Sequence, residues 1–248
     1  MTRVRIDQLL VEKGFFNSCQ QAQAAIRAGA VMVGGVAVDK PGRTVDSAAA
    51  VTIKSRSPYV SRGGEKLKGA LQSLLLEVKG MVVLDAGSST GGFTDCLLQE
   101  GAAKVYCVDV GKGQLDWKLR QDPRVVVCEG MNARYLRGED FPEKFDLVTA
   151  DLSFISLTKV LPALSGLLRE GEGLILALIK PQFELSPAEV GKGGVVRDEA
   201  ARTRAVEKIR DFVIAMGAKP AAVVPSPLPG PAGNREFFVL IAFQSKRL

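Results

Sequence analysis

The sequence feature that most constrains the fold is residues 82–95, where an apolar run breaks into glycines and a helix begins. The stretch reads V-V-L-D-A-G-S-S-T-G-G-F-T-D. An apolar run, a glycine-rich turn and an amphipathic segment indicate a strand, a tight loop and a helix, the place where an α/β sheet binds a nucleotide. The glycines are spaced G-x-x-x-G-G, which matches neither the dinucleotide fingerprint G-x-G-x-x-G nor a phosphate-binding P-loop.

Further apolar segments alternate with helices after this loop. Following a first helix at residues 65–76, strands are expected at residues 104–110, 124–128, 145–150 and 174–179. Such alternation implies a mostly parallel sheet covered on both faces. Two last strands, at 221–224 and 235–243, are separated by a Pro/Gly-rich segment too short for a helix and should pair antiparallel. The predicted fold class is α/β, a Rossmann-like sheet of the S-adenosylmethionine methyltransferase type, mostly parallel with the last strand antiparallel.

The chain before this sheet is organised differently. Helices are expected at residues 3–13 and from Asn17 or Ser18 to Gly29, followed by a hairpin around Gly34-Gly35 and a strand at 50–53. This unit resembles the small α+β RNA-binding fold named after ribosomal protein S-four, whose signature stands here as R-I-D-Q-L-L and R-A-G-A-V-M-V-G-G. Gly34 replaces the usual asparagine and can adopt the same positive-φ turn. The resemblance implies that RNA is contacted by Arg3, Arg5 and Arg27.

Positive charge is concentrated in this first part of the chain. Residues 1–66 hold ten Lys/Arg and five Asp/Glu, whereas the whole chain holds 33 and 27. This excess favours a polyanion partner, and a solubilising surface is the alternative.

Several classes of site are excluded by composition. The chain has no histidine, and its four cysteines form no C-x-x-C pair, which excludes Ser-His-Asp triads and disfavours zinc sites, so no metal is expected. No apolar run reaches the roughly 18 residues of a membrane span, and no signal core follows the first residues. We therefore expect a cytoplasmic protein that makes no membrane contact.

The glycine loop is expected to hold S-adenosylmethionine. Methyltransferases carry D-x-G-x-x-x-G-G-F at this strand, and the sequence matches every fixed position. Asp109, at the end of the next strand, is placed to accept ribose hydroxyls, or else is a cap or turn residue. Asn132 is placed to meet the adenine amino group, or else is an ordinary loop residue. The remaining cofactor-binding candidates are Asp151 and the loop itself: Asp85, Gly87, Ser88, Ser89, Thr90, Gly91, Gly92, Phe93 and Thr94.

The residues at the ends of the later strands limit which kind of atom can accept the methyl group. The fourth strand is followed by D-L-S-F in place of the N/D-P-P-Y of base-amine methyltransferases, and no cysteine lies beyond Cys128 to attack a cytosine ring. The groups that remain are Asp151, Lys180 and Glu236 at strand ends and Lys66 in the helix before the first strand. A lysine whose pKa is lowered by a neighbouring cation and partial burial can take the proton of a ribose hydroxyl, with carboxylates fixing its direction. Solvent exposure of Lys66 and a cross-strand ion pair of Glu236 are the alternatives.

Over essentially its whole length the chain resembles the TlyA (hemolysin A) family, which joins an S-four domain to an FtsJ-like RNA 2′-O-methyltransferase. Its hallmarks stand here as S-R-G-G-E-K-L, the glycine loop, A-D-L-S-F-I-S, K-P-Q-F-E, G-K-G-G-V-V-R-D and G-N-R-E. The resemblance implies a catalytic tetrad of Lys66, Asp151, Lys180 and Glu236 that methylates cytidine ribose in ribosomal RNA of one or both subunits. It also implies an S-four-like domain at 1–57, an interdomain linker at 58–64 and a methyltransferase domain at 65–248.

Further expectations concern RNA and cofactor coupling. Arg62, Lys192 and Arg197 are candidates for RNA contacts, with ordinary loop solvation as the alternative for the last two. Linker residues 56–60 are hypothesised to couple cofactor affinity to RNA docking. The partner is expected to be ribosomal RNA within ribosomal subunits, and the oligomeric state, monomer or weak dimer, is left open. Competing interpretations are a non-catalytic RNA-binding or ribosome-assembly factor, a haemolytic protein and, least favoured, a NAD-dependent dehydrogenase.

Overall fold

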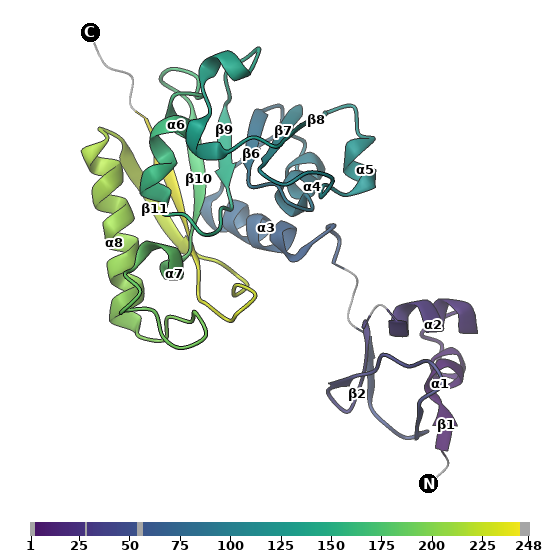
Figure 1. The fold of residues 1–248 in the computed structure, drawn as a ribbon. Coiled ribbons are helices and arrows are strands. Elements are labelled where there is room, and N and C mark those ends of the chain that lie inside the picture. The colour runs from purple at the N-terminus through teal and green to yellow at the C-terminus, as the bar shows by residue number, and fades with distance from the viewer. Residues whose placement is uncertain (1–2, 28, 54–56, 244–248) are drawn as a thin grey trace. The chain divides into compact units, whose positions relative to one another are not determined.

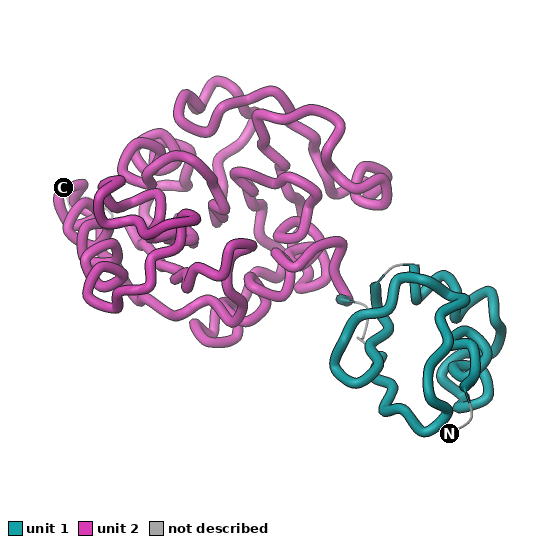
Figure 2. Tube along the Cα trace, turned by 60° about the horizontal axis from the view of Figure 1, so that its bottom comes forward, with its two compact units in different colours: residues 1–57 teal, residues 58–248 magenta. Residues whose placement is uncertain are grey.

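A computed structural model describes residues 3–27, 29–53 and 57–243. The chain divides into two compact units, Met1–Ser57 (unit 1) and Pro58–Leu248 (unit 2), which Figure 2 shows in different colours. Each unit has its own apolar core.

Unit 1 is a small α+β fold. Its helices are α1 (Ile6–Glu12) and α2 (Cys19–Arg27), and its core includes Ile6, Leu10 and Ile26, all fully buried. The turn between strands β2 (Val31–Val33) and β3 (Val36–Ala37) is the Gly34-Gly35 hairpin expected from the sequence, with φ of 58° and 81°. The remaining strands are β1 (Arg3–Arg5), β4 (Thr44–Asp46) and β5 (Val51–Ile53). The first helix is shorter than expected because β1 pairs antiparallel with β4.

Unit 2 is built on a seven-stranded sheet of order β11-β12-β10-β9-β6-β7-β8 (Figure 1). Five neighbouring strands run parallel, as predicted: β6 (Val82–Ala86), β7 (Lys104–Asp109), β8 (Val125–Glu129), β9 (Leu147–Ala150) and β10 (Leu174–Ile179). The last strand, β12 (Phe237–Ala242), is inserted antiparallel between β10 and β11 (Lys219–Pro225). This is the mostly parallel methyltransferase sheet that the alternation of strands and helices predicts.

Helices cover both faces of this sheet and form two apolar clusters. One cluster contains Leu67 and Leu97, from α3 (Arg62–Leu74) and α4 (Gly92–Gln99), and the other contains Leu161 and Ile209, from α6 (Leu161–Ser165) and α8 (Glu199–Ala215). The shorter elements are α5 (Trp117–Arg120), α7 (Pro181–Glu184) and the 3-10 helices η1 (Ala133–Tyr135), η2 (Gly138–Asp140) and η3 (Leu157–Lys159). Across the three described ranges, no helix combines the length and the apolar character needed to cross a membrane.

The segment expected as a linker, residues 58–64, lies within unit 2. The side chains of Tyr59 and Val60 pack against the core cluster that contains Leu67, and the amide of Val60 donates to Asp95 at 2.9 Å. Helix α3 begins at Arg62, three residues before the expected start, and its first turn lies against Tyr59, since a Cβ on Gly64 would overlap the Tyr59 ring. Linker residue Arg56 lies outside the described residues.

Candidate active site

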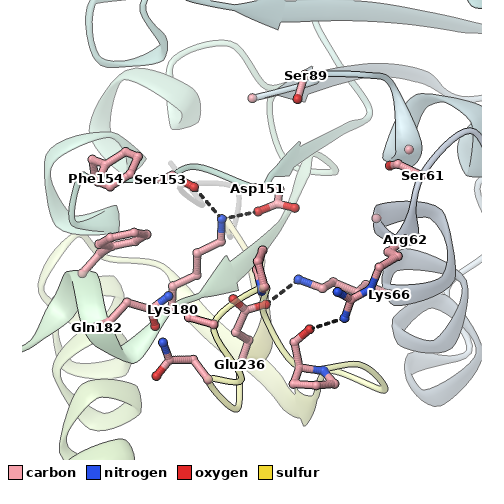
Figure 3. Close-up of a pocket in the computed structure, with 18 of the residues that line it drawn as sticks. Ser61, Arg62, Lys66, Ser89, Asp151, Ser153, Phe154, Lys180, Gln182 and Glu236 are labelled. Carbon is pink, nitrogen blue, oxygen red and sulfur yellow. Dashed lines mark hydrogen bonds and ion pairs between the residues drawn. The ribbon is translucent and has the colours of Figure 1, made fainter. Parts of the chain in front are cut away.

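The carboxyl ends of β6, β9 and β10 and the start of β12 surround one pocket of unit 2, of about 800 Å³ (Figure 3). Because parallel strands end at the same edge, side chains far apart in the sequence meet there. The pocket brings together the four expected catalytic side chains, Lys66, Asp151, Lys180 and Glu236, and the loop after β6. Its size suits a nucleoside-sized ligand.

The loop after β6 is shaped by its glycines and by its neighbours. Gly87 has φ of 84°, and a Cβ on it would lie 2.6 Å from the backbone oxygen of Asp151. The amides of Gly87 and Ser88 donate to the carbonyl of Val108, which ties the loop to β7. The members of the motif that line the pocket are Gly87, Ser88, Ser89, Thr90, Gly92 and Phe93.

Three expected cofactor-binding residues have internal positions instead. Asp85 is fully buried and accepts hydrogen bonds from Thr94 at 2.7 Å and from Thr149 at 3.0 Å. Burial raises the pKa of Asp85 to about 6, against the lowering effect of these hydroxyl donors. Thr94 is also fully buried, and Gly91 faces Leu115 and Leu119. The side chains of Asp85 and Thr94 connect β6, β9 and α4 beneath the loop and do not line the pocket. Gly91 leaves space for the two leucines.

Asp109 and Asn132 lie outside the pocket lining. The carboxylate of Asp109 accepts the amides of Ser89 and Gly111, both at 2.8 Å, and therefore fixes the glycine loop from the end of β7. Asn132 is exposed, and its side-chain oxygen caps η1 by accepting the amide of Arg134 at 3.0 Å. A cap or turn role is the alternative left open for Asp109, and a loop position is the one left open for Asn132. Each side-chain oxygen retains a second lone pair for a ligand.

Lys66 and Glu236 form the first charged pair of the site. Lys66 Nζ lies 2.6 Å from Glu236 Oε2, and both side chains are buried, with 7% and 0% of their surface exposed. Gly230 approaches so closely that a Cβ there would overlap Glu236 Oε1. Within the described residues this buried oxygen has no hydrogen-bond partner, so it keeps an unused acceptor position beside the pocket.

Lys180 and Asp151 form the second pair, which Figure 3 shows facing the pocket from β10 and β9. Lys180 Nζ lies 2.6 Å from Asp151 Oδ1 and donates to the hydroxyl of Ser153 at 2.9 Å. Two lysines and two carboxylates therefore stand as two ion pairs, neutral overall, beside the glycine loop. A hydroxyl entering this site meets both proton donors and proton acceptors.

Two aromatic residues at the pocket were not anticipated from the sequence. Phe154 is 91% exposed, has a strained φ of 63°, and its ring centroid lies 5.2 Å from that of Phe183 (Figure 3). Lys180 Nζ lies 6.0 Å from the centre of the Phe183 ring. The signal was present, because Phe154 ends the D-L-S-F stretch at the position where base methyltransferases carry an aromatic ring. Gln182, on α7, also lines the pocket and was missed.

The expected RNA-binding residues are separated between the two units. In unit 1, Arg3 and Arg27 are exposed, Arg3 lines a shallow pocket with Lys40 and Arg43, and Arg5 is paired with Asp7 at 2.7 Å. This arginine holds the pKa of Asp7 down at about 2.

In unit 2, Arg62 lines the active-site pocket and donates to the carbonyl of Pro229 at 2.8 Å. Lys192 and Arg197 are exposed outside its lining. No group of three or more Asp, Glu or Cys side chains suited to a metal ion occurs in the part of the chain that the structure describes.

Comparison with known proteins identifies the family. Residues 59–243 match the model of FtsJ-like methyltransferases, and residues 4–51 match the S4 (S-four) domain. The chain is 47% identical over 247 residues to the 16S/23S rRNA (cytidine-2′-O)-methyltransferase TlyA of Mycobacterium tuberculosis, covering 99% of this chain and 92% of that protein. The chain belongs to the TlyA family. It is thus a methyltransferase, as predicted, with a second domain of the S4 class.

Other relatives of this TlyA-family chain carry different names. Hemolysin A of Brachyspira hyodysenteriae is 39% identical over 235 residues, which cover 94% of this chain and 98% of that protein. A solved structure from Streptococcus thermophilus, whose name places it among the hemolysins, is 40% identical with a TM-score of 0.76, and the match covers 100% of this chain and 92% of that one. The whole chain, both domains included, therefore follows the pattern of the family.

Proposed function

We propose that this chain transfers a methyl group from S-adenosylmethionine to the ribose 2′-hydroxyl of cytidine in ribosomal RNA. The observation that carries the proposal is the meeting of two ion pairs, Lys66–Glu236 and Asp151–Lys180, beside the glycine loop in one pocket. The M. tuberculosis relative, at 47% identity over nearly the whole chain, is named for this reaction. The choice of cytidine and of ribosomal RNA rests on the name of this relative. The proposed transfer to a hydroxyl rests on the charged groups of the site.

The residues of the pocket fit a nucleoside cofactor. The loop 87–90 would hold it, with Asp109 fixing the amide of Ser89 behind that loop. When bound, S-adenosylmethionine supplies an electrophilic methyl group on a sulfonium cation. The cavity of about 800 Å³ leaves room beside the loop for a ribose at the two charged pairs.

Lys180 is the group that handles the proton of the ribose hydroxyl. Its Nζ is held by Asp151 Oδ1 at 2.6 Å and by Ser153 Oγ at 2.9 Å, so its direction is fixed before the substrate arrives. Once the Lys180 ammonium has lost a proton to water, the neutral amine accepts the hydroxyl proton as the oxygen attacks, and Asp151 stabilises the ammonium that re-forms. Glu236 Oε1, which is free to accept, orients the hydroxyl, and Lys66 compensates the charge of Glu236.

The rim of the pocket suits a single nucleotide taken from an RNA strand. Phe154 presents an almost fully exposed ring at the rim, backed by Phe183. Base-aromatic stacking contributes about 1–3 kcal/mol per base, so this pair can hold an unstacked base while its ribose reaches Lys180. Unit 1 supplies exposed arginines for the RNA backbone, Arg3 and Arg27.

A methyl-transfer assay with tritiated cofactor on isolated ribosomal subunits tests the proposal. We expect label in ribosomal RNA, and mapping of methylated riboses with and without the gene should locate it at cytidine. Binding of the subunits without transfer of label would instead support a non-catalytic assembly factor. Label on a base rather than on ribose would overturn the proposed chemistry.

A further inference from the structure

Glu184 is a buried carboxylate outside the pocket that contacts the loop carrying the catalytic groups. It ends α7, four residues after Lys180, and only 4% of the residue is exposed. It does not line the pocket, so it cannot touch a substrate there. A buried carboxylate requires hydrogen bonds and a compensating charge, and its partners show what it fixes.

The partners of Glu184 come from two other elements. Its Oε1 accepts the amide of Leu157 at 2.8 Å, its Oε2 accepts the hydroxyl of Ser156, and Lys208 Nζ on α8 lies 3.4 Å from Oε2. Ser156 is also the N-cap of η3 and accepts the amide of Thr158. Glu184 thus anchors the C-terminal end of the loop 151–156, where the chain enters η3.

The near end of the same loop is fixed by the sheet. The amide of Asp151 donates to the carbonyl of Ala86 on β6 at 3.0 Å. Between the two anchors lie Ser153, which accepts from Lys180, and Phe154, which packs on Phe183. The two partners, Lys180 and Phe183, lie just before Glu184 in the chain. By binding the end of the loop 151–156, Glu184 therefore holds that loop in place against residues 180–183.

We propose that Glu184 is a positioning residue for methyl transfer, which holds the loop 151–156 so that Asp151 and Ser153 meet Lys180. This rests on the proposed function. Without the carboxylate, the amide of Leu157 and the hydroxyl of Ser156 lose their acceptor, and the loop keeps only its contacts at the pocket. A shift of about 1 Å at such groups can cost about 100-fold in rate.

The test compares Glu184→Ala with a matched carboxylate at the other end of β9. Asp146 accepts the amide of Val82 at 2.8 Å and pairs with Arg169, so it also combines one backbone amide and one cation, away from the pocket. For Glu184→Ala we expect kcat per folded molecule to fall about 10- to 100-fold, with cofactor Kd within about twofold. Asp146→Ala should keep kcat per folded molecule at the wild-type value, whatever its loss of stability. Equal kcat losses in both variants, or a wild-type kcat in Glu184→Ala, would overturn the proposal.

Two further measurements keep the test decisive. Glu184→Gln retains an acceptor for Leu157 and should recover part of the lost kcat, which also serves if the alanine variant fails to fold. Hydrogen exchange of residues 152–157 in the full chain should accelerate in the Glu184 variants and stay unchanged in Asp146→Ala. If the wild-type chain methylates no RNA, the proposed function fails, and the exchange data alone decide whether Glu184 holds the loop.

Discussion

Lys66 and Glu236, 170 residues apart in the sequence, form an ion pair of 2.6 Å that is almost entirely buried. The pair joins α3, which leads into the first strand of the sheet, to the start of the last strand. Because each charge is removed from water, each depends on the other for compensation. The pair therefore stabilises unit 2 and also lines the pocket.

Removing one partner of this pair should destabilise unit 2. Glu236→Ala leaves the Lys66 ammonium buried without a counter-charge, and we expect a loss of about 3–5 kcal/mol in the free energy of unfolding, measured with urea. Glu139→Ala breaks the exposed Arg137–Glu139 pair and should change stability very little. The double variant Lys66→Met, Glu236→Gln should recover stability and remain without methyl transfer. If it regained activity, the pair would have no catalytic part.

Lys180→Ala should separate binding from chemistry. The substitution removes the amine held by Asp151 and Ser153, and we expect methyl transfer to fall by about 100-fold or more while cofactor Kd stays within a few-fold. Cofactor titration and single-turnover transfer to ribosomal RNA measure the two quantities. Full turnover by the variant on native RNA would refute the proposed mechanism.

Asp109→Ala should weaken cofactor binding while leaving the tetrad intact. Without this carboxylate the amides of Ser89 and Gly111 lose their acceptor, and the glycine loop loses its anchor on β7. Calorimetric titration should show a several-fold increase in cofactor Kd. A matched control is Asp122→Ala, which removes a carboxylate paired with Arg124 and should leave Kd unchanged. An unchanged Kd in Asp109→Ala would contradict the proposed part of this anchor in cofactor binding.

The sequence predicted the sheet of unit 2 because its signals are local. Apolar runs, turn residues and the glycine loop at 82–95 each specify an element by themselves, and the alternation of elements specifies a parallel sheet. Two features of the fold depend on tertiary contacts and could not be foreseen. Strand β1 forms because Arg3–Arg5 meets β4, which follows it by about 40 residues. Helix α3 includes Gly64, a poor helix former, because a larger residue there would overlap the Tyr59 ring.

In the candidate site, too, some features could be predicted from local sequence signals and others depend on tertiary contacts. Placement at strand ends predicted that Asp151, Lys180 and Glu236 meet, since the strand ends at one edge of the sheet converge. Lys66 was expected from the helix before the first strand, and the family resemblance implied the four as a set. The motif around Asp85 could not reveal that its carboxylate points inward to Thr94 and Thr149, because a pattern of residue types carries no information on side-chain direction at the strand end. Phe154 is exposed through a positive φ, which sequence patterns predict for glycine and not for phenylalanine.

The inward position of Asp85 makes the stability of unit 2 depend on pH. Burial raises the pKa of Asp85 from 3.8 to about 6, so the folded state binds this proton more tightly than the unfolded chain does. The stabilising contribution is complete below pH 3.8 and is lost as the pH rises through about 6.

Asp85→Asn should remove this dependence, because the amide cannot ionise and still accepts from Thr149. The variant should match the wild type near pH 4 and exceed it by about 3 kcal/mol above pH 7, at about 1.4 kcal/mol per pKa unit. Urea unfolding followed by the fluorescence of Trp117, the single tryptophan and a residue of unit 2, gives both curves. A difference that does not vary with pH would contradict the prediction.

Residues 58–60, at the start of unit 2, contact α4, the helix that follows the glycine loop. The amide of Val60 donates to the buried carboxylate of Asp95 at 2.9 Å, and Gln99 donates to the carbonyl of Pro58 at 3.0 Å. The first turn of α4 carries Gly92 and Phe93 of the pocket lining. Removal of residues 58–60 therefore leaves Asp95 without the Val60 amide and Gln99 without the Pro58 carbonyl, on the helix whose first turn lines the pocket.

Two fragments of unit 2 test whether this segment couples cofactor affinity to the rest of the chain. The fragment 58–248 keeps the contacts to Asp95 and Gln99, whereas the fragment 61–248 lacks them. We expect cofactor titration to give a several-fold higher Kd for the shorter fragment, measured at a temperature where circular dichroism shows both fragments to be folded. Equal affinities would exclude residues 58–60 as the coupling element. A loss of affinity in both fragments relative to the full chain would instead place the coupling before residue 58.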